Sequence, residues 1–111
     1  MTTLPRVQPH LHLIKVATVD DIKEGVIFTV FVRDCPVGLT RVDGVIHAFG
    51  DICTHDGGPL AEGVIEGMCV ICPRHGAKFN LKTGKPTFPA VERTPIYPVE
   101  IDGADVKILI E

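Results

Sequence analysis

The sequence lacks the hallmarks of several large protein classes. No apolar run approaches the ~20 residues of a membrane-spanning helix, and residues 1–10 contain no continuous apolar segment of the kind found in a secretory signal. Positive charge is also scarce, because 11 Lys and Arg residues stand against 14 Asp and Glu residues, which gives a formal net charge of −3. Nucleic acid is therefore not an expected partner. We expect a cytoplasmic protein without a membrane anchor.

Catalytic signatures are missing as well. The sequence contains no Gly-rich phosphate loop and no Gly-x-Ser-x-Gly motif. It also contains no repeat of 20–50 residues and no low-complexity stretch. At 111 residues the chain is long enough for one domain with a real core and too short for two. We therefore expect a single small domain that is not itself an enzyme.

Short strands dominate the pattern, and no stretch with helical periodicity exceeds about two turns. The dipeptides Asp43-Gly44 and Asp102-Gly103 lie between apolar runs and indicate hairpins, because both turn positions favour positive φ. A polar connection over residues 19–25 suggests a single helical turn. The predicted strands cover residues 11–17, 26–33, 37–42, 45–49, 68–71, 77–81, 99–102 and 106–110. The pattern predicts an all-β protein with antiparallel sheets.

The middle of the chain differs from its flanks. Residues 50–89 are rich in Gly and Pro, whereas the flanks carry most of the β-branched alternation. We therefore predict one domain over residues 1–111, with basal sheets from about residues 10–49 and 90–111. A loop-rich subdomain over about residues 50–89 is inserted between them.

Two short Cys/His pairs are the most informative feature of the chain. Cys53-Thr-His55 is followed by sixteen residues and then by Cys72-Pro-Arg-His75. A lone Cys or His is usually a packing residue, but four of them in two matched loops indicate a metal site. Each loop offers one thiolate and one imidazole, which suits a [2Fe–2S] cluster with two Cys on one iron and two His on the other.

The predicted ligands are thus Cys53 and Cys72 on an inner iron, and His55 and His75 on an outer iron. Structural zinc also takes two Cys and two His and is an alternative to the cluster. A zinc-stabilised binding module would contain one zinc per chain and show no visible absorption. Iron and acid-labile sulfide analysis separates the two hypotheses.

The pattern C-x-H-x₁₆-C-x-x-H, with Asp56-Gly57-Gly58-Pro59-Leu60 after the first pair and Ala77-Lys78-Phe79-Asn80 after the second, resembles the Rieske iron–sulfur signature. The resemblance extends from about Leu11 to Ile110. It implies a fold of stacked antiparallel sheets with a cluster-binding subdomain at one end. It also implies one [2Fe–2S] cluster per chain, held by the four predicted ligands, and one-electron transfer.

Within this family, the proteins of quinol-oxidising complexes carry a membrane anchor and two further cysteines that form a disulfide between the cluster loops. Gly58 and Arg74 occupy those two positions here. The soluble Rieske-type ferredoxins lack both features. The resemblance therefore implies a ferredoxin that passes electrons from a flavin-dependent reductase to a terminal oxygenase, often one that hydroxylates aromatic rings. We expect a monomer, because a carrier must present its cluster to two partners in turn.

An alternative within the family is the small subunit of an assimilatory reductase such as nitrite reductase. Some of those subunits lack the cluster ligands, and the presence of all four here favours electron transfer. A stable complex with a large reductase subunit, in place of a transient one, would favour this alternative.

The residues beyond the second pair bear on the reduction potential. High-potential members of the family have a Ser directly after the His-Gly of the second pair and a Tyr two positions later, where this chain has Ala77 and Phe79. Hydrogen bonds to the sulfurs stabilise the reduced state and raise the potential. We therefore predict a potential near the low end of the Rieske range, roughly −150 mV. The segment from residue 86 to residue 89 resembles the proline-containing loop that covers the cluster.

Arg74 lies between two predicted ligands and is expected to project near the cluster. With Lys78, Lys82 and Lys85 it would form a basic rim for docking a partner, unless these charges are simply solvated. The sequence gives no functional role to the remaining thiols and imidazoles, which are expected to be ordinary core or surface residues: Cys35, Cys69, His10, His12 and His47.

Overall fold

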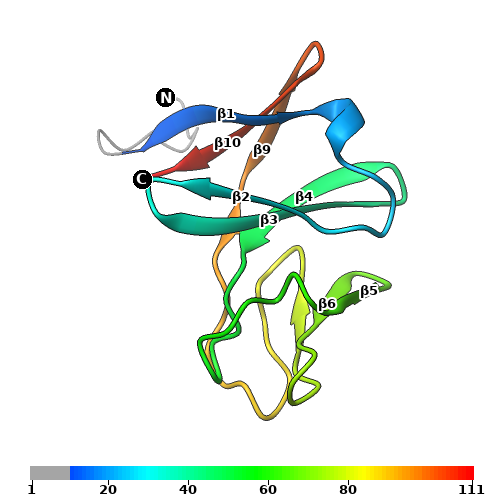
Figure 1. The fold of residues 1–111 in the computed structure, drawn as a ribbon, viewed down its shortest axis with the longest axis vertical. Coiled ribbons are helices and arrows are strands. Elements are labelled where there is room, and N and C mark those ends of the chain that lie inside the picture. The colour runs from blue at the N-terminus through cyan, green and yellow to red at the C-terminus, as the bar shows by residue number, and fades with distance from the viewer. Residues whose placement is uncertain (1–10) are drawn as a thin grey trace, which may run out of the picture.

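A computed structural model describes residues 11–111, and these form short strands connected by loops (Figure 1). No helix among the described residues is long and apolar enough to cross a membrane. A single 3₁₀ turn, η1 (Val19–Asp21), follows the first strand, where the sequence indicates a helical turn. The strands of the described residues are β1 (His12–Thr18), β2 (Phe28–Val32), β3 (Cys35–Val42), β4 (Val45–Gly50), β5 (Val64–Glu66), β6 (Cys69–Ile71), β7 (Lys78–Asn80), β8 (Ile96–Tyr97), β9 (Val99–Asp102) and β10 (Asp105–Ile110).

The strands form three antiparallel sheets, which confirms the all-β prediction. The first sheet has the order β1-β10-β9 and the second has the order β2-β3-β4-β8. These two are called the basal sheets below. The third sheet, β5-β6-β7, lies at the opposite end of the molecule together with the longest loops (Figure 1). We call this end, residues 51–92, the tip region.

An apolar core joins the two basal sheets. The strand β10 alternates half-buried and buried residues, as expected for a strand with one face on a core. Its inward residues Val106, Ile108 and Ile110 pack with Val37 and Leu39 of β3 in one buried cluster. The first and last strands of the described chain thus pair along the same sheet and close the base.

A second buried cluster fills the tip region and reaches into the basal sheets through β4. Ala48 of β4 belongs to the basal core, whereas the next residue, Phe49, is fully buried in the tip cluster. The Phe49 ring lies over Gly38 of β3, its cross-strand partner. A Cβ added at Gly38 would come within 2.5 Å of this ring, so only glycine leaves the ring its place.

Each of the eight predicted strands overlaps an observed strand, but the boundaries around residue 35 were wrong. The chain turns at Arg33-Asp34, with φ of +50° and +70°, so that β3 begins at Cys35 and contains Pro36. These residues lack the glycine that marks such a turn in sequence. The turn predicted at Asp43-Gly44 is present, with φ of +52° and +82°.

Two short strands were not predicted. β5 and β8 have three and two residues, too few for an alternating pattern to identify them. The last hairpin is shifted by one residue, because Asp102 pairs with Asp105 and leaves Gly103 and Ala104 as the turn.

Candidate metal centre

The two Cys/His loops of the tip region have the same pattern of backbone hydrogen bonds, each within its own loop. In the first loop (residues 53–58), the N–H of Cys53 donates to the Gly58 carbonyl at 2.7 Å, and the N–H of Gly57 donates back to the Cys53 carbonyl at 2.7 Å. In the second loop (residues 72–77), the N–H of Cys72 donates to the Ala77 carbonyl at 2.8 Å, and the N–H of Gly76 donates to the Cys72 carbonyl at 3.0 Å. Each loop therefore closes on its own cysteine.

The matching hydrogen bonds explain the glycines that the two loops share. Gly57 and Gly76 occupy the same position in their loops, four residues after the cysteine, and have φ of +77° and +75°. A side chain is strained in this conformation, so glycine is the residue that allows each loop to close. The histidines differ in position, since His55 lies two residues after its cysteine and His75 three.

The two thiols lie inside the molecule. Cys53 and Cys72 have exposed fractions of 0% and 1% and belong to the tip cluster, with Leu60, Val70 and Phe79 around them. Burial raises the pKa of the Cys53 thiol, and the neighbouring Cys72 raises it further. Neither thiol is oxidised to a disulfide. Two buried thiols side by side, without a disulfide, are suited to bind a cation that stabilises their thiolate forms.

The two imidazoles lie outside the thiols, at the surface. His55 is exposed, and the side chain of His75 is 52% exposed. Their ring centroids are 4.8 Å apart and their planes are nearly perpendicular, at 85°. The loops therefore bring together all four predicted ligands as two like pairs, with sulfur inside and nitrogen outside.

This separation does not suit a single tetrahedral zinc. Cys53 and Cys72 form one potential metal-binding set with Asp56, and His55 and His75 form another with the same carboxylate. Ligand atoms within such a set lie within 4.8 Å of one another, and among residues 11–111 no set contains both a thiol and an imidazole. One zinc with two Cys and two His ligands would require such a set. The arrangement fits a cofactor with a sulfur-ligated end and a nitrogen-ligated end.

Asp56 and Arg74 connect the two loops, and sequence reasoning did not foresee this contact. Nε and Nη2 of Arg74 donate to the Asp56 carboxylate at 2.5 and 3.2 Å, so both carboxylate oxygens are engaged. Hydrogen bonds from Arg74 hold the pKa of Asp56 well below its usual range, and the Gly58 N–H lowers it further. The carboxylate is therefore an ion-pair partner. The predicted basic rim is correspondingly smaller, since Lys78 also pairs with Glu66 at 3.1 Å.

A buried carboxylate supports the first loop from behind. Asp51 is 7% exposed, and its Oδ1 accepts the N–H groups of Leu60 and Ala61, both at 2.7 Å. Burial raises the pKa of Asp51, while these two N–H groups oppose that shift. The chain after the first loop is thereby fixed to the end of β4.

Residues 86–92 pack against the first loop and against β7, which follows the second loop. The N–H of Lys78 donates to Oγ1 of Thr87 at 2.8 Å, and Oγ1 of Thr54 donates to the Glu92 carbonyl at 2.6 Å. Ala90 is buried in the tip cluster, whereas Phe88 and Val91 are 88% and 84% exposed. The segment thus covers the tip cluster from one side and exposes two apolar side chains to solvent.

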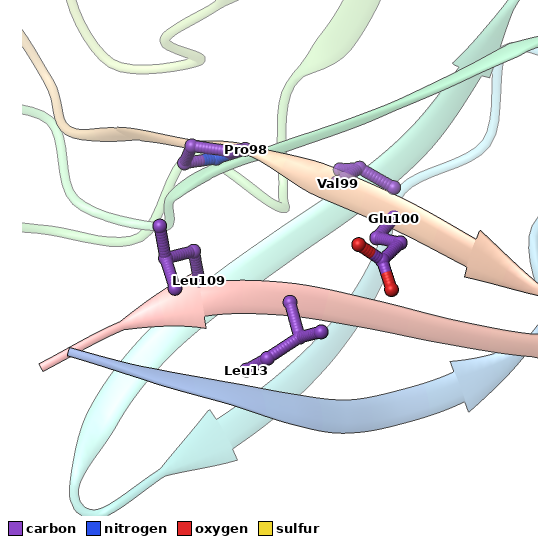
Figure 2. A pocket seen from close by; sticks show the side chains of 5 residues that line it. All are labelled: Leu13, Pro98, Val99, Glu100 and Leu109. Carbon is purple, nitrogen blue, oxygen red and sulfur yellow. The ribbon is translucent and has the colours of Figure 1, made fainter. Parts of the chain in front are cut away.

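The other cysteines and histidines named in the sequence are not among the four predicted ligands. Cys69 is half-buried in β6, and Cys35 is exposed at the start of β3. His12 is exposed on β1, and His10 lies outside the described residues. An apolar hollow lies on the β1-β10-β9 sheet, lined by Leu13, Val99 and Leu109 (Figure 2). It contains no metal-binding side chain other than Glu100, and it does not adjoin the two loops.

The comparison with protein families agrees with this geometry. The family model described as the Rieske [2Fe-2S] domain matches residues 12–98. The chain belongs to the Rieske family. Its cofactor is accordingly a Rieske [2Fe–2S] cluster, and the separation of thiols from imidazoles is the arrangement that such a cluster requires.

Relatives of this Rieske protein are ferredoxins. It is 34% identical over 99 residues to the ferredoxin component of the naphthalene 1,2-dioxygenase/salicylate 5-hydroxylase systems of a Ralstonia species, covering 88% of this chain and 95% of the relative. It is 33% identical to a chain in a complex of reduced oxygenase and oxidized ferredoxin in carbazole 1,9a-dioxygenase, with a TM-score of 0.79 over 86% of this chain and 99% of that one.

A third similarity concerns the fold alone. A putative NADH-dependent nitrite reductase small subunit from Mycobacterium tuberculosis has a TM-score of 0.80 but 20% identity, over 91% of this chain and 96% of that one. The Rieske fold therefore does not by itself separate the two predicted roles. The sequence similarity to ferredoxins does, and the chain is an electron-transfer component.

Proposed function

We propose that this protein carries single electrons from a flavin-dependent reductase to the terminal oxygenase of a multicomponent dioxygenase. Cys53 and Cys72 hold the inner iron of the cluster, and His55 and His75 hold the outer iron. When bound, the cluster accepts and releases one electron at a time. The chain acts as a monomer that contacts its two partners in turn.

The observation that carries this proposal is the opposite burial of the two ligand pairs. The thiols are 0% and 1% exposed, whereas the His75 side chain is 52% exposed. The protein interior thus surrounds the sulfur end and excludes water from it. The imidazoles form the surface through which an electron leaves, because the outer ring edges are available to a docked partner.

The segment bonded to the first loop has exposed apolar side chains that suit a transient contact with an acceptor. Phe88 and Val91 project from a segment that is hydrogen-bonded to the first loop through Thr54 and Glu92. Exposed apolar side chains of this kind are common at protein interaction sites. The solved complex of an oxygenase with a ferredoxin supports an oxygenase as the acceptor for a relative of this chain.

Spectroscopy of the purified protein tests the ligand assignment. We expect two irons and two acid-labile sulfides per chain, and a rhombic electron paramagnetic resonance (EPR) signal after reduction with dithionite. Single turnover then tests the carrier role: the reduced protein should be reoxidised by a dioxygenase terminal component and re-reduced by its reductase. A zinc-containing protein without visible absorption would overturn the proposal.

The lifetime of the complex with the partner enzyme distinguishes the oxygenase role from the nitrite-reductase role. A carrier elutes alone in size-exclusion chromatography when mixed with a stoichiometric oxygenase at physiological ionic strength, because its contact is weak and short-lived. A reductase subunit co-elutes with its large partner. Co-elution with a nitrite reductase, together with failure to reoxidise with an oxygenase, would assign the alternative role.

A further inference from the structure

Arg74 joins the two Cys/His loops by side-chain hydrogen bonds. The loops also meet where the His55 and His75 rings are in contact and where His75 Nδ1 lies 3.6 Å from Asp56 Oδ2. Arg74 of the second loop reaches across eighteen positions of sequence to the first loop, where Nε and Nη2 engage both oxygens of Asp56. Nη2 also donates to the Pro59 carbonyl at 2.9 Å. The guanidinium fork therefore contacts Asp56 in the first loop and Pro59 just after it, one on each side of Gly58.

Gly58 provides the surface on which the guanidinium lies. A Cβ added at Gly58 would come within 2.7 Å of Cζ and 2.8 Å of Nη2 of Arg74. The Gly58 N–H donates to Asp56 Oδ1 at 2.9 Å, so the carboxylate is also held by its own loop. A residue with any side chain at position 58 would displace the fork.

The clamp is partly shielded from water. The side chains of Arg74 and Asp56 are 30% and 19% exposed, whereas the side chain of Glu62, which lies 3.6 Å from Nη1 of Arg74, is 71% exposed. Bidentate, charge-assisted bonds of this geometry are among the stronger polar contacts in proteins. The Glu62 contact, being long and solvated, contributes little.

We propose that Arg74 is a positioning residue that fixes the spacing of the two loops, and thereby retains the cluster, through the shape of its fork and not merely through its charge. The proposal rests on the ligand assignment under Proposed function. Arg74 lies between Cys72 and His75, and Asp56 follows His55 directly, so the clamp joins the loops beside all four ligands.

Substitutions of Arg74 and Gly58 separate shape from charge. Arg74→Lys keeps the positive charge but cannot engage Asp56 and Pro59 together. Gly58→Ala changes no charge, and it displaces the guanidinium because Arg74 is the flexible partner in that contact. Arg74→Gln removes both. Glu62→Gln is the matched control on the solvated side of the same guanidinium, and Lys78→Gln is the control for losing a positive charge in the tip region.

The measurement is the rate at which the loaded protein loses its visible absorption to an excess of iron chelator. We expect Arg74→Lys, Arg74→Gln and Gly58→Ala each to lose the cluster about tenfold faster than wild type, the lower end of the effects seen when the surroundings of metal ligands are altered. The two control variants should keep the wild-type rate. EPR lines of the three clamp variants should broaden, because a looser loop pair samples more ligand geometries.

A double variant tests whether Arg74 acts through Asp56. Arg74→Gln combined with Asp56→Asn should lose the cluster no faster than Arg74→Gln alone, because both changes break the same contact. Additive rates would contradict a clamp between these two residues.

The failure of this inference differs from the failure of the proposed function. If wild type gives the mixed-ligand signal but Arg74→Lys and Gly58→Ala match it in rate and line width, the clamp is refuted and the function stands. Wild-type behaviour of Arg74→Lys with fast loss in Arg74→Gln would assign the effect to charge and also refute it. If wild type shows no such signal, the ligand assignment is refuted and the clamp has no cluster to retain.

Discussion

Strands of up to eight residues pair along their length in the basal sheets, whereas the strands of the tip region have three residues each. The basal core consists of aliphatic side chains on facing strands. The tip cluster contains the two predicted sulfur ligands among its buried residues. Short strands and a small core provide little stability alone, so we infer that the tip region needs its cofactor to stay folded and the base does not.

The largest expected effect comes from removing a sulfur ligand. Cys53→Ser and Cys72→Ser should abolish the visible absorption of the protein entirely, because serine does not replace a thiolate on the inner iron. Amide hydrogen exchange should then accelerate in β6 and β7 while β3 and β10 stay protected. Cys35→Ser, at an exposed position, should preserve the spectrum. Equal acceleration in both regions would mean that the base also depends on the cofactor.

A deletion in the basal core should give the reverse result. Leu39 of β3 is 0% exposed, and Leu39→Ala should lower the free energy of unfolding by about 2–5 kcal/mol, the usual cost of removing a buried leucine side chain. The loaded variant should keep the wild-type reduction potential, because Leu39 belongs to the basal core. Denaturant unfolding and voltammetry on the same sample measure both quantities. A shifted potential would show that the two regions are not separable.

A smaller change is expected from adding a hydroxyl next to the sulfurs. Ala77 is fully buried in the tip cluster with Cys53 and Cys72, and Ala77→Ser should raise the potential. A hydrogen bond worth about 1 kcal/mol corresponds to about 40 mV for a one-electron couple. Phe79→Tyr should act in the same direction. Voltammetry of wild type should give roughly −150 mV. A value above about +100 mV would refute the low-potential prediction.

The smallest effect concerns His47 on β4, where the base meets the tip region. Burial lowers the pKa of His47 below its ordinary value of 6.5, and Lys82 of the tip region adds to this shift. The folded protein then binds fewer protons than the unfolded chain, so stability is complete above pH 6.5 and falls as the pH drops through the folded pKa.

The measurement compares wild type with His47→Gln, which cannot titrate. Between roughly pH 7.5 and roughly pH 5.5, wild type should lose stability relative to His47→Gln as the pH falls. Parallel pH profiles would show that His47 keeps an unshifted pKa. Repeating the comparison in a Lys82→Gln background tests whether the tip region contributes to the shift. The loss of stability at low pH should then be slightly smaller than in wild type.

Local patterns in the sequence were sufficient to predict much of this protein. The spacing of Cys53, His55, Cys72 and His75 predicts two loops with one thiol and one imidazole each. Asp43-Gly44 specifies its hairpin, because both residues tolerate the positive φ that the turn requires. These features depend on residues within one loop or turn, and the identity of those residues encodes the backbone conformation.

Features that depend on distant segments were not predictable. The pairing of β4 with β8 joins residues 48 and 97, and two-residue strands carry no periodic signal. The contact between Arg74 and Asp56 exists only when the two loops are brought together, so Arg74 was expected to face a partner. The turn at Arg33-Asp34 was missed because arginine seldom adopts positive φ and no glycine stands at this turn.

Phe49 has a consequence for how this carrier moves. Its ring is buried among the tip residues while its backbone belongs to β4, and Gly38 leaves no gap behind it. The tip region is thus packed directly onto the basal sheets through this ring. We infer that the tip region and the base move as one body, so that an electron would be passed on by reorientation of the whole molecule and not by a swing of the tip.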